Sequence, residues 1–235
     1  MINDCDNVDE YFWFIKKEFE FDYKNKSGKI NISLNGGAST QEFEMVNGNY
    51  NGKFTSKDKL GNKISDFQYV NGKINNNYKY YSPYGTLMFE RNYYCGLING
   101  TDTQYDLVGN LRITSEYSFG DDNGKTIRYY HNKSKMFEYN EFDGLTEGDY
   151  IYYNQKGEPI LKLEYEGNAV VSYSTLSKTG GFNEKIATPN ESAEITSYYP
   201  NGKVAMKLNL IKGSINGKLE INSAEGKPEY EANYK

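Results

Sequence analysis

Glycines recur along this chain at intervals of 24 residues, in three separate columns. The first column contains Gly28, Gly52, Gly100, Gly124 and Gly148, with Asn76 in the vacant place. The second contains Gly37, Gly61, Gly85, Gly109, Gly157 and Gly181, with Lys133 in the vacant place. The third contains Gly48, Gly72, Gly96, Gly120 and Gly144. A fixed period of this length indicates a repeat protein, in which each repeat packs against its neighbours.

The repeat is interrupted once, after Gly181, where its phase slips by three residues. It then resumes, because Gly202 and Gly226 are again 24 residues apart. We expect one repeat domain over residues 1–235, with about ten units. Its parts are an N-terminal cap unit (1–27), regular repeats (28–167), a degenerate unit (168–192) and C-terminal repeats (193–235).

Each unit has the pattern of a β-hairpin, as residues 76–100 illustrate. Tyr78–Ser82 is the expected first strand, 83–85 a turn, and Leu87–Tyr94 the second strand. The segment 96–100 is then expected to turn into the next unit. Its Asn-Gly pair favours the positive φ angles of a tight turn between strands.

The strands alternate in polarity, which indicates a sheet with one apolar and one solvated face. Leu161 and Leu163 alternate with Lys162, and Met206 and Leu208 alternate with Lys207. The expected fold is therefore all-β: an elongated, single-layer antiparallel β-meander of about 20 short strands built from 24-residue hairpin repeats. So long a sheet must twist or curl.

Composition restricts the classes of partner. The 24 tyrosines and 12 phenylalanines separate the chain from disordered sequences, which are poor in aromatic residues. A net charge of −5 and the lack of a Lys/Arg cluster disfavour nucleic acid as a partner. No apolar run is long enough for a membrane span, and no signal peptide is visible. Cys5 and Cys95 are predicted to be free thiols, because array contacts join neighbouring repeats only.

Tyrosines at one repeat position are the main candidates for a binding site, because tyrosine is enriched in protein interfaces. This tyrosine column consists of Tyr81, Tyr105, Tyr129, Tyr153 and Tyr198. The alternative is that they only cover the sheet and pack on neighbouring strands.

Other polar residues are candidates for catalysis or metal binding. Carboxylates recur at one position (Asp66, Glu90 and Glu138) and two residues further along (Glu116 and Glu164). They are expected to form a solvated face, with acid–base catalysis or cation binding as the alternatives. His131, the only histidine, is expected to be an exposed turn residue, and Asp121-Asp122-Asn123 does not match a calcium-binding loop. We expect no catalytic, cofactor-binding or metal-binding residues.

The repeat pattern Tyr-Tyr-x-x-x-Gly-x-x-x-x-Glu/Lys-x-x-Tyr-x-x-Gly-x-x-x-Gly resembles the MORN-repeat variant of bacterial YwqK-family antitoxins. Residues 81–100, 153–167 and 198–203 carry the resemblance best. It implies a twisted single-layer β-sheet and a role in protein binding or immunity, with no shared catalytic residues.

The leading hypothesis is therefore a non-catalytic protein-binding module that occludes a partner, such as a toxin. The alternative is a cell-surface or periplasmic protein that recognises a host protein or a glycan, and a hydrolase using the carboxylates is the third. An antitoxin would be cytoplasmic, whereas a chain that has lost a signal peptide would be exported. The sequence leaves the oligomeric state open, because exposed terminal strands can pair edge to edge.

Overall fold

The computed structural model of this protein describes residues 19–22 and 24–235. These residues form 20 β-strands and two short 3-10 turns, and no α-helix occurs among them. The strands are β1 (Phe19–Asp22), β2 (Ser27–Leu34), β3 (Ser39–Val46), β4 (Asn49–Asp58), β5 (Lys63–Val70), β6 (Lys73–Tyr81), β7 (Leu87–Tyr94), β8 (Leu97–Tyr105), β9 (Leu111–Ser118), β10 (Asp121–Asp122), β11 (Gly124–Tyr129), β12 (Lys135–Phe142), β13 (Leu145–Tyr153), β14 (Pro159–Glu166), β15 (Ala169–Thr175), β16 (Ile186–Ala187), β17 (Ala193–Tyr198), β18 (Val204–Ile211), β19 (Ser214–Asn222) and β20 (Pro228–Tyr234). The predicted all-β hairpin meander is confirmed.

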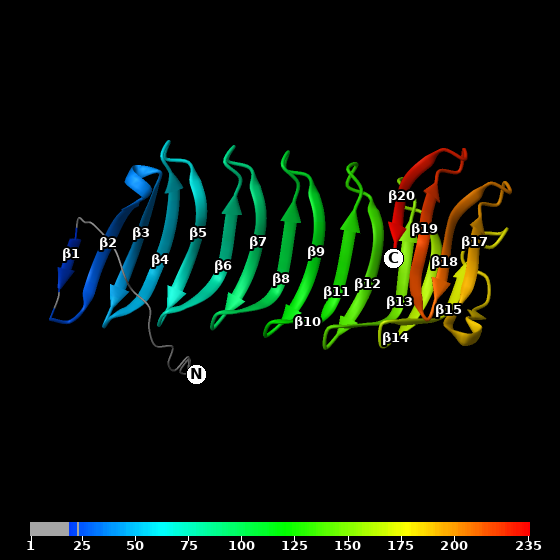
Figure 1. Cartoon of the computed structure of the whole chain (residues 1–235), viewed down its shortest axis with the longest axis horizontal. Coiled ribbons are helices and arrows are strands. Elements are labelled where there is room, and N and C mark those ends of the chain that lie inside the picture. The colour runs from blue at the N-terminus through cyan, green and yellow to red at the C-terminus, as the bar shows by residue number, and fades with distance from the viewer. Residues whose placement is uncertain (1–18, 23) are drawn as a thin grey trace. The chain divides into compact units, whose positions relative to one another are not determined.

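Strand order follows chain order (Figure 1). β1 to β16 make one 16-stranded sheet, in which β10 pairs only with β9, and β17–β20 make a second, four-stranded sheet. The chain divides into two compact units. Of the described residues, unit 1 comprises those up to Asn110 and Tyr117–Gly120, and unit 2 comprises Leu111–Glu116 and Asp121–Lys235.

Two-residue turns with positive φ close the hairpins at one edge of the ladder. Cys95 and Gly96 have φ angles of 51° and 85°, and Asp143 and Gly144 have 49° and 73°. This pair of left-handed residues matches the twist of the flanking strands. The connection predicted over 96–100 is thus wrong in extent, because the chain already enters β8 at Leu97. Gly100, with a φ of 95°, lies inside that strand instead of in a turn.

Cys95 also corrects a prediction, because it forms a disulfide instead of being a free thiol. The prediction assumed contacts between neighbouring repeats only. Cys95 lies in a turn, outside the regular ladder, so that assumption does not restrict it. Cys5 lies outside the described residues.

In unit 1 the apolar core lies on one face of a single sheet. Its buried side chains are Ile30, Ile32, Phe43, Phe54 and Phe67. Consecutive strands contribute one ring each to a row in which Phe54 and Phe67 stack at 4.5 Å and Phe67 and Tyr78 at 4.7 Å between ring centroids. We call this side the aromatic face. Stacked cross-strand rings shield one another from water, which stabilises this face of the sheet.

The aromatic row is interrupted by an ion pair. Arg91 and Asp102 occupy the repeat positions that hold Phe67 and Tyr78 in the preceding unit. Asp102 is only 1% exposed, and its carboxylate accepts a hydrogen bond from Arg91 Nε at 2.8 Å. Gln104 Nε2 donates to its other oxygen, also at 2.8 Å. Both oxygens of the buried carboxylate are therefore satisfied.

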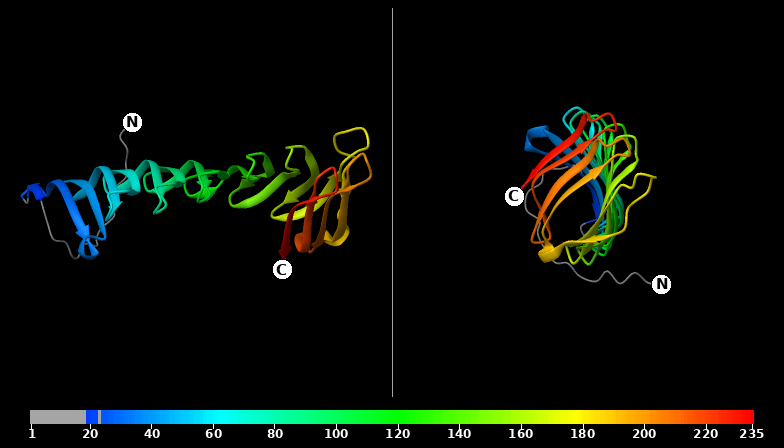
Figure 2. Two further views of the ribbon diagram at one scale, coloured as in Figure 1. Left: turned by 90° about the horizontal axis from the view of Figure 1, so that it is seen from above. Right: turned by 90° about the vertical axis from the view of Figure 1, so that its right-hand side faces the viewer.

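Unit 2 covers its apolar face with a second layer. Figure 2 shows β17–β20, in orange and red, facing β13–β15, and side chains from both sheets form one core. Leu161 and Leu163 from the first sheet and Met206 and Leu208 from the second are at most 1% exposed. These are the side chains that the alternation placed on one face. Ser197 Oγ joins the two layers by donating to the carbonyl of Ile160 at 2.7 Å.

The break between the sheets falls within the degenerate unit predicted at 168–192. There β16 has only two residues, so the ladder offers too few backbone groups for another full strand to pair. The next hairpin starts a new sheet, and the repeat then continues on top of the last strands of the first.

We predict that the sheet-to-sheet contact at Gly213 tolerates no side chain. A Cβ at this position would lie 2.7 Å from Ala169 Cβ and 3.1 Å from Ala169 Cα. Gly144 is the matched control, because it has the same φ of 73° and open space around it. Gly144→Ala should cost about 1 kcal/mol for the left-handed backbone, and Gly213→Ala about 2 kcal/mol more for the clash. Urea unfolding measures both, and equal losses would contradict the proposed contact.

The ion pair gives a second prediction. Arg91→Met alone should destabilise the protein by about 3 kcal/mol, because it leaves a buried carboxylate without its partner charge. Combining it with Asp102→Leu should restore most of that loss, since apolar side chains then continue the row. A double variant as unstable as the single one, in the same urea titration, would show that charge burial is not the cause.

Candidate partner-binding surface

Three successive turns in unit 1 hold their tips in one conformation. They join β4 to β5, β6 to β7, and β8 to β9, and Figure 1 shows them along one edge of the sheet. In the first, Asp58 Oδ1 accepts hydrogen bonds from the backbone N–H groups of Leu60 at 2.8 Å and Asn62 at 2.9 Å. Ser82 and Asp106 make the same pair of bonds in the next two turns. A hydrogen bond from the Asn62 side chain also lowers the pKa of Asp58, which keeps this capping group ionised.

The tips of these turns present large apolar side chains to solvent. Leu60, Tyr84 and Val108 occupy one repeat position and are 77%, 89% and 79% exposed. Leu107, next to Val108, is 64% exposed. We call these four residues the tip patch. Alternate strands lie roughly 10 Å apart, so the tips form a row at that spacing.

Unit 2 uses the same repeat position differently. There the residues are polar and bind the next turn along the sequence or the second sheet. Asn132 Nδ2 donates to the carbonyl of Gln155 at 2.7 Å, and Lys156 Nζ donates to Glu225 Oε1 at 3.1 Å. Apolar, exposed tips are therefore a property of unit 1 and not a requirement of the turn. Leu60, Tyr84 and Val108 already stand 24 residues apart in the sequence, but this spacing alone does not indicate that they are exposed.

The tyrosine column lies at strand ends, close to these turns. Its members are the last residues of β6, β8, β11, β13 and β17. Tyr198 is 52% exposed, and the other four are half-buried. A register shift precedes Tyr81, Tyr129, Tyr153 and Tyr198. Tyr81 follows Tyr80, whose ring stacks on Phe89 at 5.2 Å on the aromatic face, so alternation places Tyr81 on the opposite side.

Two further tyrosines of the column bind polar partners. Tyr153 OH donates to Glu138 Oε1 at 2.7 Å, and Tyr129 OH lies 3.5 Å from Thr114 Oγ1. Among the described residues, the ring contacts include no pair within the column. The structure therefore places these tyrosines at equivalent positions without joining them into a stack of rings.

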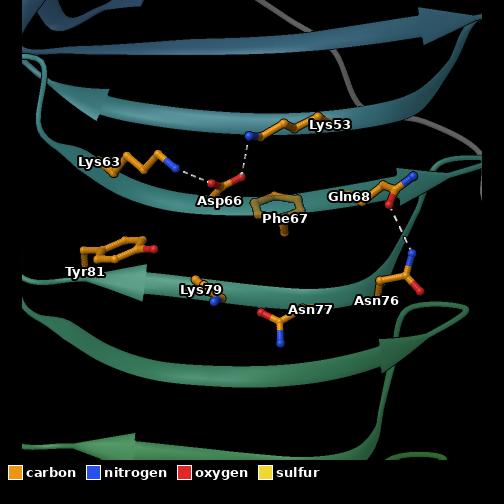
Figure 3. A pocket seen from close by; sticks show the side chains of 9 residues that line it. All are labelled: Lys53, Lys63, Asp66, Phe67, Gln68, Asn76, Asn77, Lys79 and Tyr81. Atoms are coloured by element: carbon orange, nitrogen blue, oxygen red, sulfur yellow. Dashed lines mark hydrogen bonds and ion pairs between the residues drawn. The ribbon is translucent and has the colours of Figure 1, made fainter.

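The side of unit 1 opposite the aromatic face is charged, and we call it the polar face. It contains a hollow of about 530 Å³ over β4–β6, lined by Lys53, Lys63, Asp66, Lys79 and Tyr81 among others (Figure 3). Figure 3 shows both Lys53 and Lys63 reaching the Asp66 carboxylate, with Tyr81 at the end of the neighbouring strand. Lys53 Nζ lies 3.5 Å from Asp66 Oδ1, and Lys63 Nζ lies 2.5 Å from Asp66 Oδ2.

The predicted carboxylate column is bound by basic and amide groups. Asp66 pairs with lysines, and Glu90 accepts from Asn77 at 2.6 Å and lies 3.4 Å from Lys79. Glu138 accepts from Lys135 Nζ at 2.7 Å and from Tyr153. Each carboxylate thus has its own partners, an arrangement that suits a salt-bridged surface.

The remaining candidates stay separate from one another. His131 is exposed in the turn after β11, as predicted, with Nδ1 3.1 Å from Arg112 Nη1. Asp121 and Asp122 form the short strand β10. Across residues 19–22 and 24–235 there is no group of three or more His, Cys, Asp or Glu placed to hold a metal ion.

Comparisons with protein-family models and with curated proteins give no match for this chain. Within the part of the chain that the structure describes, no helix has the length and apolar character needed to traverse a bilayer.

Glu138 gives a prediction about acid stability. Burial alone raises the pKa of this carboxyl, but the hydrogen bonds from Lys135 and Tyr153 outweigh it and hold the pKa below its usual value. A lowered folded-state pKa stabilises the fold above the ordinary glutamate pKa, and this contribution is lost as pH falls through the folded value. Wild type should therefore lose more stability than Glu138→Gln between pH 6 and pH 3.

Urea midpoints at the two pH values measure this difference. Tyr153→Phe should reduce the acid sensitivity by a smaller amount, because Lys135 still binds the carboxylate. Identical pH dependence in wild type and Glu138→Gln would rule out the contribution.

Proposed function

We propose that this protein is a non-catalytic binding module that recognises another protein through the tip patch and the adjacent tyrosines. The observation that carries this proposal is the row of exposed Leu60, Tyr84 and Val108 on turns whose conformation is held by side-chain caps. Single exposed apolar residues are common on protein surfaces, but a regularly spaced row of them is typical of interaction sites.

The mode of binding follows from the rigidity of the surface. Each tip is capped by two hydrogen bonds to its backbone, so little conformational entropy is lost when a partner binds. Tyr81 and Tyr105 end strands β6 and β8, three residues before Tyr84 and Val108, and would add aromatic groups next to the tips. Aromatic anchors of this kind contribute most of the affinity at protein interfaces. If a partner contacts several tips at once, the part of its surface that lies against these repeats is occluded.

The resemblance to MORN-repeat variants supports an immunity role for such occlusion. In that role the partner is a toxin whose active surface is covered, and the chain contributes no chemistry of its own. The shape and polarity of the tip patch support protein recognition in general, and the resemblance adds the toxin as the class of partner to test first.

The test uses the full chain as bait for partners from its source cells. A variant with Leu60→Ser, Tyr84→Ser and Val108→Ser should weaken the affinity for the captured and purified partner by at least about 100-fold, the loss of several central anchors. Titration calorimetry with the isolated partner measures this change.

The control makes the same kind of change at the opposite edge of unit 1. Tyr94→Ser, Leu97→Ser and Phe119→Ser remove side chains that are 39%, 48% and 59% exposed. This variant should bind like wild type. Equal loss in both variants, or loss only in the control, would overturn the assignment of the tip patch.

A further inference from the structure

One carboxylate on the polar face holds two lysines together. Lys53 and Lys63 both reach Asp66, from β4 and from the start of β5. The carboxylate is only 18% exposed, whereas the lysines are 68% and 45% exposed. The acid is therefore covered, whereas both lysine side chains reach solvent.

The same arrangement recurs three repeats further along the chain, in unit 2. Lys125 and Lys135 lie 3.7 Å and 2.7 Å from Glu138 Oε2. This carboxylate is 13% exposed and the lysines are 47% and 43% exposed. A tyrosine of the column accompanies each cluster: Tyr153 donates to Glu138, and Tyr81 lines the hollow around Asp66.

The two repeats between these clusters lack the pair of lysines. In the next repeat, Asn77 and Leu87 stand at the two lysine positions and Glu90 at the carboxylate position. In the repeat after that, these three positions hold Thr101, Leu111 and Thr114. The ladder itself therefore does not require lysines there. We call Lys53–Lys63 and Lys125–Lys135 the lysine pairs.

A lysine pair is unbalanced by itself. One carboxylate neutralises one ammonium group, so each cluster keeps a net charge of about +1 and sets two like charges side by side. An ammonium group has three donors, and only part of this capacity is used by the buried acid. An incoming anion would relieve the repulsion and accept the remaining hydrogen bonds.

We propose that each lysine pair, by itself, binds a carboxylate side chain in an acidic segment of the partner protein. This inference rests on the proposed function and specifies the chemistry of the partner. A single carboxylate matches the charge of each cluster. A dense polyanion carries more charge than one such cluster can neutralise, and the chain as a whole has a net charge of −5.

The probe for this proposal is a fluorescently labelled peptide of twelve residues in which single glutamates are separated by neutral residues. Its binding to the full chain is followed by anisotropy at low and at high salt. We expect Lys53→Gln with Lys63→Gln, and separately Lys125→Gln with Lys135→Gln, to weaken binding about tenfold each at low salt. Salt should reduce the difference, because exposed charges are screened.

Two controls separate recognition from net charge and from misfolding. Lys156→Gln with Lys218→Gln removes two lysines that also pair with glutamates in unit 2 and should leave peptide binding unchanged. Replacing a lysine pair by arginines keeps its charge and should retain most of the binding.

Equal losses in the paired and the control variants would overturn the proposal, since only net charge would then matter. Binding of a sulfated glycan in place of the glutamate peptide would also overturn it, in favour of a polyanion site. A purified partner that is released by the tip-patch variant but bound normally by both lysine-pair variants would refute this inference and leave the proposed function intact.

Discussion

The antiparallel hydrogen-bond ladder, closed at fixed intervals by left-handed turns, is the constraint on which the rest of this protein depends. Because each unit returns the chain to the same register, a residue type repeated in sequence becomes a row in space. The pair at Cys95 and Gly96 shows the local cause: both residues have positive φ, so the turn continues the strand twist. Rows of rings, charges and tips all follow from this register.

A sheet of this kind must protect its apolar side, and the two units do so differently. In unit 1 large rings stack from strand to strand, as Phe54 does on Phe67 at 4.5 Å. In unit 2 a second sheet covers the first, and Leu163 and Met206 are fully buried. The second solution provides a core of the usual kind, while in the first no second sheet from the described residues covers unit 1.

This difference explains why the candidate surface lies in unit 1. In unit 2 the equivalent turn residues Asn132 and Lys156 bind the next turn or the second sheet. In unit 1 the same position carries Leu60, Tyr84 and Val108, which are exposed on capped, rigid turns. The lysine pairs add charge on the polar side of the same ladder. Shape, apolar contact and charge are thus distributed over separate rows of one repeating scaffold.

The sequence by itself determined the repeat and the sharing of faces, but not the length of every strand: the strand predicted at Tyr78–Ser82 is β6, which already begins at Lys73. The second strand predicted at Leu87–Tyr94 matches β7 at both ends, and the alternation at Leu161 and Leu163 identifies buried side chains. These features depend on neighbours within one or two strands, so local periodicity is enough to define them. The sequence also shows Leu60, Tyr84 and Val108 at one repeat position, but it does not show that these side chains are exposed.

Only the tertiary structure decided which rows are covered and which are open. The phase slip after Gly181 marked an irregular unit, but it did not show that the ladder stops there and the chain folds back. That outcome depends on contacts between distant residues, such as the hydrogen bond from Asn154 to Tyr199, 45 residues away. Periodicity defines which residues share a face, whereas burial of that face depends on what the rest of the chain places against it.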